Sequence, residues 1–239
     1  SVFALTETYI RKALSWRPSR VRVWIPVMQT PQGIPVFASP YLFAIAFDTA
    51  PSDFTNQAVT NSVTISHTNT GSNLITAGMV SALTGAGSVT GVTYAAEAMS
   101  LGVTADQGGD AGETHIWLKT SPATGANNMV FSASANIMSR ESAASYSGCA
   151  QSGQPNATGT NITGFTDAAE VQVSATSTVT DVWGLMHIAN DRGTPIADTN
   201  ATLRTSRAGA GYGFFDSNGS LGAAGSKTMG WHVAGTGVN

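Results

Sequence analysis

The chain has 239 residues, a formal net charge of −3 and only 10% charged residues, well below the quarter that is usual in globular domains. It is long enough to bury a large hydrophobic core without metal ions, and its lone cysteine, Cys149, excludes an intrachain disulfide. No apolar run is long enough to span a bilayer and no signal peptide is recognisable, so we expect a protein made in the cytoplasm.

Basic residues are concentrated at the N-terminus. The first 22 residues contain five basic residues and one acid, which leaves six basic and 13 acidic residues, a net charge of −7, for the rest of the chain. A basic end on an acidic body is typical of an arm that docks on a negative partner. An acidic protein surface is favoured over nucleic acid, because aromatic stacking platforms are not interleaved with the basic residues.

The first 45 residues differ from the rest in composition and in hydrophobic pattern. Residues 1–17 are predicted to form a short helix that Pro18 ends, packed either on its own domain or on a neighbouring subunit. Residues 20–47 combine prolines with many apolar side chains, which favours edge strands and extended segments over a central strand. We therefore predict an N-terminal attachment arm, residues 1–45, with a short helix. The arm residues predicted to contact a partner are Arg11, Lys12, Trp16, Arg17, Arg20, Arg22, Trp24, Ile25 and Phe37.

Residues 46–239 are predicted to form one β domain, because strand-like segments alternate with turns rich in Gly, Asn and Ser. In residues 61–79, Val63, Ile65 and His67 alternate with polar residues before a polar turn and a second apolar run, which predicts an antiparallel strand pair with one buried face. The overall pattern predicts an all-β fold, an antiparallel jelly-roll-like β-sandwich. Strands are predicted at 57–68, 73–83, 88–104, 113–120, 127–135, 143–151, 169–176, 179–189, 200–206 and 228–235, and long loops at 148–166 and 207–227.

No catalytic or cofactor-binding motif is recognisable, and we predict a protein that is not an enzyme and binds no cofactor. His67 and His115 occupy strand contexts and are interpreted as framework residues. Cys149 also lies in a strand-like context, and we interpret it as a small buried residue, since no basic residue lies nearby in sequence to lower its pKa.

Two weaker patterns leave binding sites open. Oxygen ligands for Ca²⁺ could come from Asp106, Asp110 and Glu113, or from Asp191 and Asp198, but solvated turns are the favoured interpretation and no metal site is predicted. Tyr212, Phe214 and Phe215 could form an exposed sugar-binding face or pack on the core.

A series of motifs in fixed order extends this interpretation. They are Ser66–Thr68 with Thr70–Asn73, Val92–Tyr94 with Met99, Trp117-Leu118, Pro122–Gly125 with Asn127, and Ser145-Tyr146 with Gly148 and Gln151. In this order and spacing, residues 47–189 resemble a jelly-roll domain of structural proteins from tailed bacteriophages. The chain departs from that pattern at Lys119–Ser121, at Cys149, commonly Val, and at Ala95-Ala96, where the pattern has Asn-Gly. The resemblance implies a virion component with no inherited catalytic residues.

The expected function is therefore a capsid decoration, or cement, protein that is made in the host cytoplasm and is located on the capsid surface of the virion. Its expected partners are the major capsid protein, bound by the arm, and further copies of itself, with a homotrimer as the expected oligomer. Membranes are excluded as partners and nucleic acid is disfavoured. The alternative is a head-fibre or tail-fibre module that binds host-surface glycans through loops 106–113, 152–164 and 207–227.

Overall fold

The computed structural model describes residues 25–29, 35–38, 44–52, 58–84, 87–106, 112–162, 170–190, 193–207 and 211–233. Within these ranges the protein is all-β and its paired strands are antiparallel. No helix that could span a membrane occurs there. The chain divides into two compact units, Ser1–Leu42 and Phe43–Asn239. The helix predicted for residues 1–17 lies outside the described residues.

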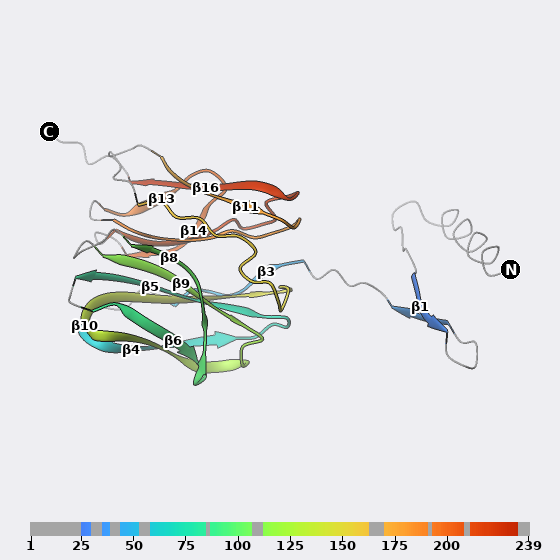
Figure 1. Cartoon of the computed structure of the whole chain (residues 1–239), viewed down its shortest axis with the longest axis horizontal. Coiled ribbons are helices and arrows are strands. Elements are labelled where there is room, and N and C mark those ends of the chain that lie inside the picture. Colours follow the sequence, from blue (N-terminus) through green and yellow to red (C-terminus); the bar gives the residue numbers. More distant parts are fainter. Residues whose placement is uncertain are drawn as a thin grey trace. The chain divides into compact units, whose positions relative to one another are not determined.

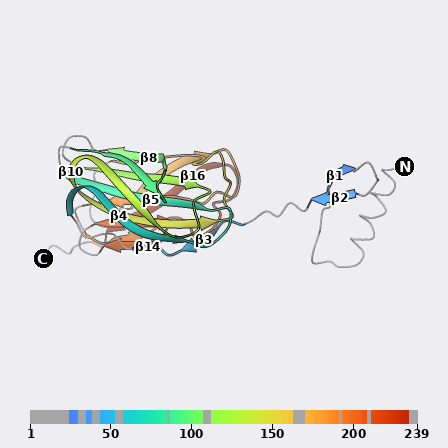
Figure 2. The same cartoon turned by 90° about the horizontal axis from the view of Figure 1, so that it is seen from below.

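The first unit contains a two-stranded sheet, in which β1 (Ile25–Gln29) pairs with β2 (Pro35–Ala38) (Figure 2). Pro35 opens β2, and Pro26 lies beside an irregularity in the register. Strands tolerate proline at these positions because a missing N–H then costs no central ladder bond. Both strands are edge strands, in agreement with the interpretation of this proline-rich region.

The second unit is a stack of four β layers (Figure 1). The first layer contains β4 (Ala58–Asn69), β6 (Val89–Tyr94), β7 (Glu97–Ala98) and the first half of β10 (Gly125–Ser147). The second contains β3 (Ala46–Thr49), β5 (Ile75–Thr84), β8 (Ser100–Asp106), β9 (Glu113–Thr120) and the second half of β10. The third contains β12 (Leu185–Ala189), β14 (Thr202–Arg207) and β15 (Tyr212–Asp216), and the fourth contains β11 (Val171–Ser177), β13 (Pro195–Ala197) and β16 (Gly225–Val233).

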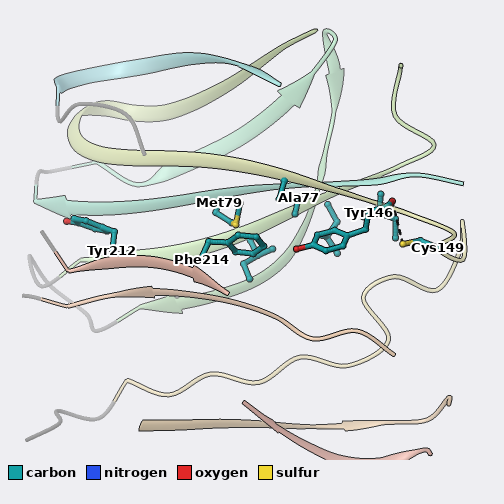
Figure 3. Packing of buried hydrophobic residues seen from close by; sticks show 10 residues of the cluster. Ala77, Met79, Tyr146, Cys149, Tyr212 and Phe214 are labelled. Carbon is teal, nitrogen blue, oxygen red and sulfur yellow. Dashed lines mark hydrogen bonds between the residues drawn. The ribbon is translucent and has the colours of Figure 1, made fainter. Parts of the chain in front are cut away.

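The strand β10 belongs to both of the first two layers. Its residues 125–132 and 137–139 pair with β4 and residues 129–133 with β6, whereas residues 138–146 pair with β5. The register with β4 shifts between Ser132 and Ile137, and the strand curls back on itself in the region of the bend (Figure 3). The separate strands predicted at 127–135 and 143–151 are therefore one strand, and the intervening Arg140 and Glu141 are buried within it.

The strand pair predicted for residues 61–79 is wrong. Both segments are strands, but β4 and β5 do not pair with each other; each pairs with β10, in the first and the second layer respectively. Residues 70–74 therefore form an arch that crosses between layers, polar except for the buried Leu74. Moreover, β5 is buried on both faces, since Met79 packs toward the third layer and Val80 toward the first.

Three hydrophobic clusters fill the spaces between successive layers. The cluster between the first and second layers contains Ile65, Val80, Val92, Tyr94, Met99, Met129, Phe131 and Ala143. The cluster between the second and third contains Ile75, Ala77, Met79, Ile116, Leu118, Ala144, Tyr146, Cys149, Tyr212 and Phe214 (Figure 3). The cluster between the third and fourth contains Met186, Ile188, Phe215, Met229, Trp231 and Val233.

Small residues allow the second layer to be covered on both sides. A Cβ atom on Gly78 would lie 2.8 Å from Met129 Sδ, so the first layer approaches as closely as a glycine permits. Ala77, Ala143 and Ala144 are fully buried in the same layer. Bulkier side chains here would force the neighbouring layers apart.

Two other segments differ from the sequence-based prediction. Within the predicted loop 207–227, Tyr212–Asp216 forms β15, the fully buried central strand of the third layer. The predicted strand 88–104 is three strands, because Ala95 and Ala96 form a two-residue turn between β6 and β7. By contrast, β9 has the predicted bounds, 113–120.

The Ala95-Ala96 turn predicts a stabilising substitution. Both residues have positive φ, 52° and 64°, the combination that a type I′ hairpin turn requires and that costs alanine about 1–2 kcal/mol per residue. We expect Ala96→Gly, at this exposed position, to raise the free energy of unfolding by ~1 kcal/mol, measured by urea denaturation. The control Ala98→Gly, in β7, should lower it by ~0.5–1 kcal/mol. A destabilised A96G variant would contradict the turn assignment.

Candidate functional site

The predicted arm residues are only partly within the described residues. Ile25 begins β1 and Phe37 lies in β2. The register pairs Ile25 with Ala38 and Pro26 with Phe37, so Ile25 and Phe37 occupy neighbouring rungs of the small sheet. The remaining arm residues, Arg11, Lys12, Trp16, Arg17, Arg20, Arg22 and Trp24, lie outside the described ranges. A partner site in the arm therefore stays a prediction.

A Ser–His–Asp cluster that the sequence analysis did not identify lies at the edge of the first two layers. His67 Nε2 lies 3.1 Å from Ser145 Oγ, and Ser145 Oγ donates a hydrogen bond to Asp48 Oδ2 at 2.9 Å. Asp48 also accepts hydrogen bonds from the backbone N of Thr70 at 3.0 Å and from its Oγ1 at 2.8 Å. The three residue types come from β4, β10 and β3, so only the fold brings them together.

The order of the hydrogen bonds rules out triad chemistry in this arrangement. In a catalytic triad the histidine lies between the serine and the acid and accepts the serine proton. Here Ser145 lies between, and its single hydroxyl proton is directed to Asp48. His67 must therefore carry its proton on Nε2 and donate it to Ser145 Oγ, so in this arrangement His67 cannot accept the serine proton. His67 and Ser145 are also buried, so the cluster is a framework contact, as predicted for His67.

The electrostatics of the cluster agree with a structural role. Burial lowers the pKa of His67 to about 4, although the nearby Asp48 charge acts in the opposite direction. Burial tends to raise the pKa of Asp48, but the hydrogen bonds from Thr70, Ser145 and Thr49 outweigh it and hold the pKa below its usual value. The folded state thus keeps His67 neutral and Asp48 ionised, which fixes β3 and the arch after β4 onto β10.

A second polar cluster joins the second and third layers. Asp216, which is fully buried, accepts hydrogen bonds from Arg204 Nε at 2.7 Å and from Tyr146 Oη at 2.9 Å. The Arg204 guanidinium carbon lies 4.4 Å from the centre of the Phe47 ring. Burial, together with the Asp216 charge, raises the pKa of Tyr146 well above its usual value, so its hydroxyl stays a donor. The third layer is therefore attached to the second by the hydrogen bond from Tyr146 to Asp216, whose charge is paired with Arg204 within the third layer.

The acidic groups considered for Ca²⁺ are used in other contacts. Asp106 and Glu113 are paired residues of the β8–β9 ladder, and Glu113 Oε1 accepts a hydrogen bond from the backbone N of Val89 at 2.6 Å. Asp198 contacts His232 Nδ1. Asp110 and Asp191 lie outside the described residues. Among the side chains that the structure describes, no three His, Cys, Asp or Glu residues converge as a metal-ligand set.

The aromatic residues considered for a sugar-binding face are in the core. Tyr212, Phe214 and Phe215 are all buried in β15, so the core-packing alternative is correct for them. Cys149 is buried as predicted, but it follows the end of β10 instead of lying in a strand. Burial raises the pKa of its thiol to about 11, which keeps it protonated and unreactive at neutral pH.

A cavity of about 850 Å³ lies among the second, third and fourth layers. Its floor is the apolar face of β8 and β9, including Val103, Ile116 and Leu118, and one wall is β12. The opposite wall is segment 154–162, which is part of the loop predicted at 148–166. Sequence reasoning missed this cavity because its walls come from segments far apart in the chain. Its size is within the range of ligand-binding cavities.

Comparison with known proteins finds no match: no family model fits the sequence, and no curated protein or solved structure is similar enough to indicate a family.

The buried histidines predict a steep loss of stability in mild acid. Burial lowers the pKa values of both His67 and His187 to about 4 from an ordinary value of 6.5. Between these values the unfolded chain binds protons that the folded chain does not, so each histidine lowers the free energy of unfolding by up to ~1.4 kcal/mol per pH unit as the pH falls. Denaturant unfolding from pH 7 to pH 4 measures this slope.

The variant His67→Gln should reduce the slope by about half, because its amide can still donate to Ser145 Oγ but does not titrate. The control Ser66→Ala, exposed on the same strand, should leave the slope unchanged. A wild-type stability that is flat between pH 6.5 and pH 4.5 would show that these histidines do not stay neutral.

The Arg204–Asp216 ion pair in the third layer predicts a large loss of stability on truncation of one partner. Arg204→Met would leave the Asp216 charge buried without its cation, and we expect unfolding to become easier by ~3 kcal/mol in urea denaturation. The control Lys119→Met removes a pair with the exposed Glu97 and should cost less than ~1 kcal/mol. Equal losses in the two variants would contradict the assigned role of Asp216.

Proposed function

We propose that this protein is a non-enzymatic structural component of a tailed-bacteriophage virion, a decoration or cement protein held on the capsid by its N-terminal arm. The observation that carries the proposal is the division of the chain into a small N-terminal unit and a large β unit. The basic residues are concentrated in the first, whereas the second is acidic and sparsely charged. This separation is typical of a docking segment attached to a rigid body.

The residues that carry the resemblance to phage jelly-roll domains support the proposal, because they contact one another. Tyr94 Oη donates to the backbone O of His67 at 3.1 Å, and Asn127 Nδ2 donates to Tyr94 Oη at 3.5 Å. The arch is held to the end of β10 by hydrogen bonds from the backbone N of Gly148 and Cys149 to Ser72 and Asn73. These motif positions are therefore framework contacts, which fits a structural protein.

We interpret the first two layers as the jelly-roll-like part of this body. The antiparallel strands around β10 form two facing layers with a shared apolar core, as in a jelly roll. The third and fourth layers, which contain β11–β16, are additional to it. The stretch that resembles phage proteins ends at residue 189, so β13–β16 lie beyond it. The two layers give the body a second surface that is remote from the first layer.

Attachment would use the apolar and basic side chains of the arm. Trp16, Trp24, Ile25 and Phe37 would be buried at junctions between capsid subunits, and Arg17, Arg20 and Arg22 would pair with acidic groups of the major capsid protein. A specific contact needs about 1,000 Å² of buried surface, which twenty to thirty residues can supply. On a symmetric capsid, and in a homotrimer, repetition of a modest contact would raise the apparent affinity by avidity.

A receptor-binding module for host-surface glycans is the second candidate, and one observation favours it. Segment 154–162, within a loop predicted to contact sugar, lines the 850 Å³ cavity together with Trp183. Its amide and hydroxyl side chains, with an aromatic ring nearby, are groups that can recognise a sugar. A glycan array with the full-length protein separates the candidates, because the decoration function requires no glycan binding.

Deletion of the arm tests the first candidate. Ile45 packs against the core between the second and third layers and Ala46 pairs with Ser147, so the deletion should remove residues 1–42 and spare the body. We expect the truncated protein to keep its β circular-dichroism spectrum and cooperative unfolding but to lose binding to capsids in a co-sedimentation assay. The control Lys119→Ala, on the body, should bind normally. Full occupancy by the truncated protein would refute arm-mediated attachment.

A further inference from the structure

The third layer has an open edge that faces the cavity. The layer order is β12-β15-β14, so β12 has a strand neighbour on one side only within the described part of the chain. The backbone O of Gly184 accepts from Ser217 N, and the backbone N of Asn190 donates to Gly211 O. Alternation along an antiparallel strand therefore directs the backbone groups of Leu185 and Ala189 away from β15. Consecutive residues 184–190 all line the cavity.

The edge strand of the fourth layer, β11, is covered by segment 154–162, in contrast to β12. Along β11, Asn161 Nδ2 donates to the backbone O of Gln172 at 3.0 Å, and Asn156 Oδ1 accepts from the backbone N of Thr178 at 2.9 Å. A Cβ atom on Gly159 would overlap the backbone O of Ser174, so this segment runs directly against the strand. Proteins usually cover or blunt such edges, because an open edge pairs with other chains.

The cavity is lined in a way that would suit one further strand beside β12. A strand placed beside β12 would lie between the second and fourth layers, with Ile116 and Leu118 on one face and Val173 and Met229 on the other. Both of its faces would be buried, so its residues must be largely apolar. The cavity therefore lies where a fourth strand of the third layer would pair with β12.

We propose that β1 of a second copy of this chain pairs with β12 and fills this cavity. The two strands have the same length, five residues, and four of the five residues of β1 are apolar, Ile-Pro-Val-Met-Gln. The sheet that β1 forms with β2 has two strands, and a two-stranded sheet is marginally stable in water without further packing. Strand addition of this kind is a common mode of peptide recognition.

Charge favours the same occupant. The cavity lining includes two acidic residues, Asp181 and Glu113, of which Glu113 has its carboxylate bonded to the backbone N of Val89. Its lysine, Lys227, already donates to the backbone oxygens of Leu221 and Ala223. The residues that precede β1 include Arg20 and Arg22, whose charge is opposite to that of Asp181 in the cavity lining. This self-association does not depend on attachment to a capsid, so each can fail without the other.

Proline at the open edge provides a direct test. Ala189→Pro removes an N–H that points away from β15, so it should block strand addition without loss of a β12–β15 hydrogen bond. In sedimentation velocity of the full chain at micromolar concentrations, we expect the wild type and the control Ala189→Val to self-associate. A189P should associate at least about tenfold more weakly, with the circular-dichroism spectrum of the control. A wild type that is monomeric throughout, or an A189P variant that associates like the control, would overturn the proposal.

Intermolecular cross-linking gives a second test that does not depend on the proline variant. In a Cys149→Ala background, chains carrying Val27→Cys or Met28→Cys are mixed with chains carrying Ala189→Cys and oxidised. Paired strands bring Cα atoms within disulfide range, so we expect mixed dimers. Chains carrying Ser66→Cys, exposed on β4 in the first layer and outside the cavity lining, are the control. Equal cross-linking to both sites would overturn the proposal and leave the cavity to a segment of a different protein.

Discussion

The structure depends on one strand that belongs to two layers. Because β10 pairs first with β4 and β6 and then with β5, the first two layers are a single folded sheet with a core inside the fold. The second layer is consequently covered on both sides, and only small side chains such as Gly78 and Ala144 fit where the neighbouring layers approach most closely. The low charge of the chain follows from this architecture, since a layer covered on both faces has few positions for solvated charges.

Polar groups buried between layers determine how the layers are aligned. Apolar contacts alone tolerate sliding, but His67 with Ser145, Tyr146 with Asp216 and Ser81 with His187 each have one productive alignment. Breaking one of these contacts would leave a polar atom buried without its partner, which is costly. The pairs therefore fix the alignment of each layer on the next.

The sequence was sufficient to predict the all-β class and many strand positions, but not how the strands pair. Alternation in residues 61–69 indicates which face of the strand is buried but not which strand is its neighbour. The pattern therefore predicts that residues 61–79 form a strand pair, whereas in the structure residues 70–74 form an arch between two layers. β15 was missed because glycines flank Tyr212 and Phe214 and the stretch has the composition of a loop. The cavity and the open edge of β12 arise from packing between remote segments, which no local pattern reveals. The arm residues remain a prediction from composition.

The position of β3 has a mechanical consequence. β3 is the first strand of the body after Leu42, so tension applied to the chain from its N-terminal side reaches β3 before any other strand. Its backbone pairs with the last residues of β10, and its Asp48 side chain is bound to Ser145 and to Thr70. Force applied to β3 would thus be transmitted both to β10, which belongs to two layers, and to the arch, residues 70–74, that joins them. Asp48 distributes force, and its removal should make the body peel from this edge.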